Sequence, residues 1–214
     1  MRSKLVLLFA ASTLLVSCVK NEYYTPEPNP PAPPPPVGYQ YSFNDDFDRD
    51  IHNWSFSDPE NSAFVNISGG TLNYTYDPVN DGTNTVAILT GANLRRDFLI
   101  QTRITSDNAM GLAFGVSNSD YGYSLFIDDQ GYFALYKEGD ANTQVSTILD
   151  WQFSDAIQPG WNDIELEQVG NYWMGYANGI KLFEVPAKYI AGSKIGYIVL
   201  AATNGRADYL TVQW

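Results

Sequence analysis

A chain of 214 residues has room for one domain with a well-buried core, and its single cysteine and single histidine exclude a disulfide framework and a zinc site built from Cys and His. The 24 acidic residues outnumber the 12 lysines and arginines and give a net charge of −12. We therefore expect no nucleic acid partner, because phosphates are neutralised by clustered cations and the few cations here are scattered.

The N-terminus predicts an export signal. Arg2 and Lys4 precede the apolar run 5–16, which is shorter than the roughly 20 residues that span a bilayer. The run ends in Leu15-Val16-Ser17-Cys18, which resembles the lipobox of bacterial lipoproteins. We expect residues 1–17 to be a lipoprotein signal peptide and Cys18 to be the lipidated first residue of the mature chain. An ordinary secretory signal beside a stray cysteine is the alternative.

A linker, residues 18–38, follows the signal. Its segment 25–38 (TPEPNPPAPPPPVG) is so rich in proline that it disfavours helix and sheet and favours extended polyproline II, reaching about 40 Å at ~3.1 Å per residue. Val19 follows Cys18, so there is no Asp at that position to indicate retention in the inner membrane. The sequence predicts an outer membrane lipoprotein of a Gram-negative bacterium, on the periplasmic or cell-surface side, that contacts the membrane through its lipid only.

Residues 39–214 predict one all-β domain. Short aromatic and β-branched runs alternate with Gly, Asn, Asp and Pro every 8 to 12 residues, without a convincing helix. Turn residues at Ser68-Gly69-Gly70, Asp129-Gln130-Gly131 and Asn178-Gly179 predict antiparallel hairpins. The expected strands are 63–67, 71–76, 85–89, 98–104, 111–117, 121–128, 131–138, 143–151, 161–168, 172–177, 180–185, 194–201 and 208–214. That many antiparallel strands are buried best as a two-sheet sandwich or jelly roll.

Several segments resemble a known fold family. The opening FNDDF (43–47) with Trp54, the segment PGWNDIELEQVGNYWMGYANG (159–179) and the closing KIGYIVLA (194–201) are similar to the concanavalin A-like, laminin-G-like jelly roll. They are especially similar to sandwich domains of exported Bacteroidetes lipoproteins and to the 3-keto-disaccharide hydrolase domain. The resemblance implies an antiparallel two-sheet sandwich, and it implies function less well, since members bind sugars, proteins or nothing known.

Three carboxylates are candidate catalytic or binding groups. Endoglucanases of the resembled fold use a strand motif Glu-x-Asp-x-x-Glu, from which this chain departs. Its nearest match is Asp163, Glu165 and Glu167, which alternate with apolar residues and so should share one strand face at about 7 Å spacing. Such spacing is compatible with a glycosidase. The alternative is an ordinary strand whose acids form its solvent-exposed face. His52 alone does not support a Ser-His-Asp triad.

The aspartates near the start and end of the domain suggest calcium. Asp46 and Asp48 lie in the run NDDFDRD (44–50), and Asp208 begins the last expected strand, which in the resembled fold commonly pairs near the first. Their oxygens could converge on a structural calcium ion, and a solvated turn in which Asp caps backbone amides is the alternative.

Aromatic side chains favour binding by stacking. On the strand 172–177 alternation places Tyr172, Met174 and Tyr176 outward, beside the row of acids if the strand 161–168 is its neighbour. Ring faces beside carboxylate acceptors suit a sugar. The sequence thus favours an envelope-anchored, non-catalytic binding module with a glycan ligand. A glycoside hydrolase-like enzyme and a structural or adhesive envelope protein are the alternatives.

Overall fold

The chain folds into strands in all three segments, residues 38–119, 121–139 and 144–214, that the computed structural model describes. The strands are β1 (Ser42–Asp45), β2 (Phe56–Ser57), β3 (Ala63–Ser68), β4 (Thr71–Tyr76), β5 (Thr83–Leu89), β6 (Phe98–Ser106), β7 (Ala109–Val116), β8 (Tyr123–Asp128), β9 (Tyr132–Lys137), β10 (Ser146–Phe153), β11 (Asn162–Val169), β12 (Tyr172–Ala177), β13 (Ile180–Pro186), β14 (Lys194–Leu200) and β15 (Thr203–Gln213). The predicted signal peptide, Cys18 and the linker up to residue 37 lie outside these segments. Among the described residues there is no helix long and apolar enough to cross a membrane.

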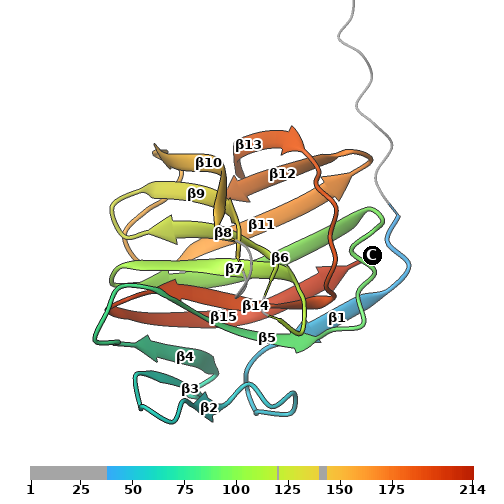
Figure 1. The fold of residues 1–214 in the computed structure, drawn as a ribbon. Coiled ribbons are helices and arrows are strands. Elements are labelled where there is room, and N and C mark those ends of the chain that lie inside the picture. Colours follow the sequence, from blue (N-terminus) through green and yellow to red (C-terminus); the bar gives the residue numbers. More distant parts are fainter. Residues whose placement is uncertain (1–37, 120, 140–143) are drawn as a thin grey trace, which may run out of the picture. The chain divides into compact units, whose positions relative to one another are not determined.

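Two antiparallel sheets stack face to face (Figure 1). The larger sheet has the order β13-β12-β11-β6-β15-β4-β3-β2, with β1 paired to β15, and the smaller sheet has the order β10-β9-β8-β7-β14-β5. The predicted all-β sandwich is therefore confirmed. The predicted hairpin turns are confirmed as well, since Gly69, Gly70, Gly131, Asn178 and Gly179 all have the positive φ that such turns require.

The two ends of the domain differ from the prediction. The strands β1 and β2 were not expected, because SFND and FS are too short to show a strand pattern and depend on their partners β15 and β3. The last strand begins at Thr203 instead of Asp208. A register shift between Ala207 and Tyr209 places Asp208 at an irregularity in the middle of that strand.

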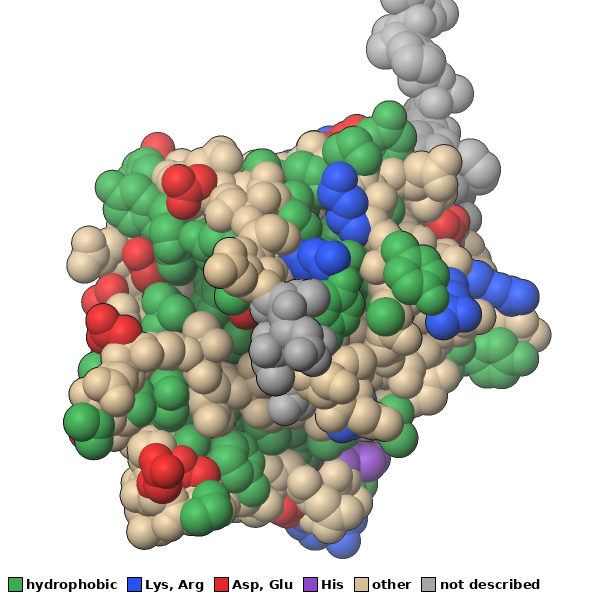
Figure 2. All heavy atoms as spheres, in the orientation of Figure 1, with side chains coloured by type: hydrophobic (Ala, Val, Ile, Leu, Met, Phe, Trp, Pro, Cys, Tyr) green, Lys and Arg blue, Asp and Glu red, His purple; other side chains and the backbone are tan. Residues whose placement is uncertain are grey.

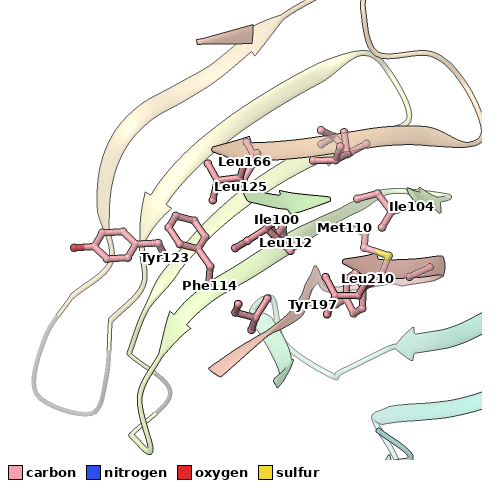
Figure 3. Packing of buried hydrophobic residues seen from close by; sticks show 14 of the residues in the cluster. Ile100, Ile104, Met110, Leu112, Phe114, Tyr123, Leu125, Leu166, Tyr197 and Leu210 are labelled. Carbon is pink, nitrogen blue, oxygen red and sulfur yellow. The ribbon is translucent and has the colours of Figure 1, made fainter. Parts of the chain in front are cut away.

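The core lies between the sheets. Side chains from β6, β11 and β15 of the large sheet meet those from β7, β8 and β14 of the small sheet, as the close view of the packing shows (Figure 3). Ile100, Leu112, Leu125, Leu166 and Leu210 are each fully buried in this layer. Strand alternation with one face toward this layer is what fixes the direction of every outward side chain.

A buried carboxylate fastens the start of the domain to the core. Asp45 accepts hydrogen bonds from Trp54 Nε1 at 2.8 Å and from the Phe47 amide at 3.0 Å, and it contacts His52 Nδ1 at 2.7 Å. Trp54 and Phe47 pack against Tyr197 of β14. The first acidic residue of the run 44–50 is therefore part of the interior.

The two ends of the domain are joined directly. The Tyr41 amide donates to the Trp214 carbonyl at 3.0 Å, and the Trp214 amide donates back to the Tyr41 carbonyl at 3.1 Å. The two rings stack with centroids 5.8 Å apart. This pairing continues the β1–β15 ladder by one further step.

The outer face of the small sheet is also largely buried. Ala109, Ala113, Val116, Phe126 and Ile198 form a second apolar cluster there, with Tyr136 and Trp151 packed against it. On the same face, a Cβ added to Gly196 would lie 2.0 Å from the Val86 carbonyl oxygen. The neighbouring backbones approach too closely at this point for any side chain.

We expect Gly196→Ala to destabilise the domain by about 1 to 3 kcal/mol or more, because the added methyl group can be accommodated only by moving the backbone of β5. Gly38→Ala is the matched control, since nothing lies within 4 Å of a Cβ built there. Urea unfolding followed by tryptophan fluorescence measures both. Equal midpoints for the two variants would show that the close approach is absent.

Candidate functional site

The candidate site lies on the outer face of the large sheet, on β11 and β12. The two strands are joined by a tight turn in which Gly170 has φ +57°, and they pair with Glu165 opposite Tyr176 and Glu167 opposite Met174. The expected antiparallel neighbours are thus confirmed. Cross-strand partners of this kind have adjacent side chains on one face.

Alternation along both strands is as predicted. Ile164, Leu166, Trp173 and Ala177 point into the core and are buried. All six predicted site side chains point outward: Asp163, Glu165 and Glu167 on β11, and Tyr172, Met174 and Tyr176 on β12. Tyr172 is the most accessible of the three β12 side chains, with 49% of its surface exposed, while Met174 and Tyr176 are half-buried.

Each carboxylate has a polar neighbour that the local sequence pattern does not reveal. Glu165 accepts a hydrogen bond from Gln101 Nε2 of β6 at 2.8 Å. Glu167 accepts one from the Tyr39 hydroxyl at 3.4 Å. Asp163 lies 3.5 Å from the Tyr209 hydroxyl, which donates to it, and 4.0 Å from Arg103 Nε. The row of acids is therefore partly held in place before any ligand arrives.

Glu167 is the electrostatically unusual member of the row. Burial raises its pKa above the usual value, the negative charge of Glu165 adds to the rise, and the hydrogen bond from Tyr39 opposes it. Burial together with the Glu167 carboxylate also raises the pKa of Tyr39, so its phenol stays protonated and donates. The phenol thus donates its one O–H to Glu167, which keeps further acceptor capacity at this end of the face.

A tryptophan flanked by two arginines adjoins the acids. Trp161 lies just before β11, and the guanidinium carbons of Arg103 and Arg206 lie 5.5 and 5.2 Å from its ring centroid. Neither Trp161 nor the two arginines were among the site residues predicted from the sequence. Alternation along β6 predicts that Leu99, Gln101 and Arg103 point outward. It assigns Gln101 and Arg103 to the site only once β6 is known to pair with β11.

The six predicted side chains lie outside the main hollows of the described residues. None of the six predicted side chains lines any of the five main hollows in the described part of the chain. The nearest hollow, of about 450 Å³, lies beside Tyr39, Asp97 and Trp214. Two carboxylates that act on a glycosidic bond need to flank a bound substrate, and none of these five hollows is lined by Asp163, Glu165 or Glu167.

The three aspartates expected to bind calcium are not brought together. Asp208 lies 3.5 Å from Arg103 Nη1, and Asp46 accepts the Asp48 backbone amide in a local turn at 3.2 Å. Among residues 38–119, 121–139 and 144–214, no group of three or more His, Cys, Asp or Glu side chains is arranged to hold a metal ion. Asp208 lies at the register shift in β15 and forms an ion pair with a cation of β6.

Comparisons with known proteins identify the fold. No family model matches the chain. No curated protein matches it either. Among solved structures, it is similar to the carbohydrate binding module CBM66 from Bacillus subtilis, with a TM-score of 0.52 and 17% identity over 67% of this chain and 86% of that one. It is also similar to the CBM2 module of the evolved Dit of Lactobacillus casei BL23 phage J-1, with a TM-score of 0.52 and 9% identity over 83% and 97%.

A third similar structure is an enzyme. The GlcNAcα1-4Gal releasing endo-β-galactosidase from Clostridium perfringens matches with a TM-score of 0.51 and 13% identity, over 86% of this chain and 65% of that one. At these identities the likeness establishes the jelly-roll sandwich and nothing finer. Function has to be argued from the residues of the site.

Ionisation of Glu167 should oppose folding. The pKa of Glu167 is higher in the folded chain than in the unfolded chain. Its stabilising contribution to the free energy of unfolding is therefore complete at pH values below the unfolded pKa, and it is lost as the pH rises through the folded pKa. Glu167→Gln cannot ionise, so the Tm of the variant relative to the parent chain should increase between about pH 4 and about pH 8.

Thermal unfolding followed by circular dichroism at a series of pH values measures this difference. Glu60→Gln, which removes an exposed glutamate in the loop before β3, is the control for the loss of one charge. A Tm difference for Glu167→Gln that is constant with pH would contradict the assignment.

Proposed function

We propose that this protein is a non-catalytic glycan-binding module that uses the outer face of β11 and β12. The observation that supports this best is the pairing of Tyr176 with Glu165 and of Met174 with Glu167. Tyr172 and Asp163 point outward on the same two strands. Sugar rings present CH faces that pack on aromatic rings, and hydroxyls that donate to carboxylates. The face offers both kinds of contact within one strand pair.

The neighbouring polar groups fit the same proposal. Gln101, Arg103 and Tyr39 partly hold the carboxylates in place, so less conformational entropy is lost when a ligand binds. Two of the similar structures are described as carbohydrate-binding modules, which supports this ligand class for the fold. The ligand itself is a proposal from the chemistry of the face.

Binding is favoured over hydrolysis because the acids form an open row. The Asp163 side chain is 61% exposed and lies 4.0 Å from Arg103 Nε, so it is an open, solvent-facing carboxylate on the sheet surface. We expect no release of reducing ends from glycans that the protein binds. Turnover that is lost in Glu165→Gln or Glu167→Gln would establish the enzymatic alternative instead.

Display at the cell envelope completes the proposal. We propose that Cys18 is lipidated, that the proline-rich linker spaces the domain from the lipid, and that the protein belongs to the outer membrane of a Gram-negative bacterium. The support is the lipobox-like sequence and the composition of residues 25–38. A tether would allow the domain to collect glycans near the cell surface.

We expect Tyr172→Ala and Tyr176→Ala each to weaken glycan binding by about tenfold, which corresponds to about 1.4 kcal/mol, because each removes one apolar ring from the face. A glycan array identifies the ligand, and affinity gel electrophoresis compares the variants. Phe64→Ala is the matched control, since Phe64 is an exposed aromatic side chain on β3 of the same sheet. Unchanged binding in both tyrosine variants would place the ligand elsewhere.

We expect Cys18→Ser to abolish the attachment of lipid to the mature N-terminus, because no thiol is left to receive the lipid. Ser17→Ala, which keeps a small residue before the cysteine, should leave the protein in the membrane fraction. Cell fractionation and mass spectrometry of the N-terminal peptide report the two results. An N-terminal peptide of the parent chain that carries no lipid on Cys18 would rule out the lipid anchor.

A further inference from the structure

A second hollow, of about 540 Å³, lies at one end of the small sheet. It is formed where the start of β8, the end of β9 and the start of β10 meet, since Tyr123 and Ser146 both pair with Lys137. The connection between β13 and β14 closes the other side. The lining residues are Tyr121, Tyr123, Lys137, Ser146, Thr147, Ile148, Lys188 and Tyr189. This volume lies within the range of small-molecule sites.

The aromatic wall of the hollow is anchored in the core. Tyr123 is buried, and its ring packs against Trp173 at 4.8 Å and Phe114 at 5.4 Å between centroids. Its hydroxyl donates to the Tyr189 carbonyl at 2.8 Å and so fixes the connection that holds Lys188. Burial, with a smaller effect from Tyr121, raises the pKa of Tyr123 to about 12, which keeps this donor protonated. The hollow is therefore preformed on at least two sides.

The described residues that line the hollow have a charge opposite to that of the molecule. The chain has a net charge of −12, yet two lysines and no Asp or Glu are among the described residues that line this hollow. Lys137 Nζ lies 4.9 Å from the Tyr121 ring centroid, and the Arg95 guanidinium lies 5.6 Å from the Tyr189 ring centroid. Figure 2 shows blue side chains close together over the connection between β13 and β14.

We propose that this hollow binds an acidic saccharide, a sugar that bears a carboxylate or a sulfate. The ammonium groups of Lys137 and Lys188 would pair with the anionic substituent, and the Tyr121 and Tyr189 rings would pack on the sugar face. The hydroxyls of Ser146 and Thr147 supply further hydrogen bonds to sugar hydroxyls. The protein as a whole repels anions because its net charge is negative. An anion that binds here is therefore attracted by the two lysines of the hollow.

The inference does not rest on the β11–β12 face. None of Asp163, Glu165, Glu167, Tyr172, Met174 and Tyr176 lines this hollow, so each of the two surfaces can bind or fail to bind by itself. The two surfaces also differ in preference, because a row of carboxylates repels the anionic ligand that the lysines attract.

The test is isothermal titration calorimetry of the mature chain with polygalacturonate, fully methyl-esterified polygalacturonate and heparin. We expect at least one of the two acidic polymers to bind. If polygalacturonate is that ligand, its methyl ester should bind at least tenfold more weakly, because esterification removes the charge and keeps the sugar backbone. Lys137→Gln and Lys188→Gln should each weaken binding by about tenfold, the effect of one charged hydrogen bond. Lys194→Gln is the matched control, since it removes the same charge on β14 outside the hollow.

Three outcomes would overturn the proposal. The first is that neither polygalacturonate nor heparin binds, and the second is that polygalacturonate and its methyl ester bind equally while heparin does not bind. The third is that Lys137→Gln and Lys188→Gln both leave the binding unchanged. The tyrosine variants on β12 separate the two sites. Acidic polymers that still bind to Tyr172→Ala and Tyr176→Ala use the hollow, whereas loss of their binding in those variants places them on the β11–β12 face and counts against this inference.

Discussion

The pairing of β11 with β6 on one side and with β12 on the other is the constraint on which the rest of the molecule depends. It buries Leu166 and Trp173 in the core and thereby forces their chain neighbours outward. A slip of one residue would turn acids into the interior and apolar side chains into water. The same interaction that stabilises the sandwich therefore defines its candidate binding face.

The parts of the fold that local sequence determines were predictable. Gly170, Asn178 and the glycines at 69 and 70 mark turns whose positive φ angles the structure shows, and alternation then gives the outward residues of β11 and β12 correctly. What depends on partners distant in the chain was not predictable. Gln101 meets Glu165 across 64 positions, and Tyr39 meets Glu167 across 128.

The calcium prediction illustrates the same limit. Asp208 looked like the first residue of a strand because Gly205 and Ala207 obscure the strand pattern before it. In the structure β15 begins earlier and is irregular at this point, and Asp208 meets Arg103. Proximity of aspartates to the two ends of a domain says nothing about register, which only the assembled sheet determines. The lysine-lined hollow was missed for a similar reason, since Lys137 and Lys188 come together only through strand pairing and the β13–β14 connection.

The reciprocal hydrogen bonds between Tyr41 and Trp214 bring the two ends of the domain to one place on its surface. A domain with adjoining ends can be inserted into an exposed loop of another protein without separating the halves of its host. The order of its strands can also be permuted circularly by a short link across that point. The sandwich can thus be transferred into another protein as one unit, together with its surfaces on β12 and beside Lys188.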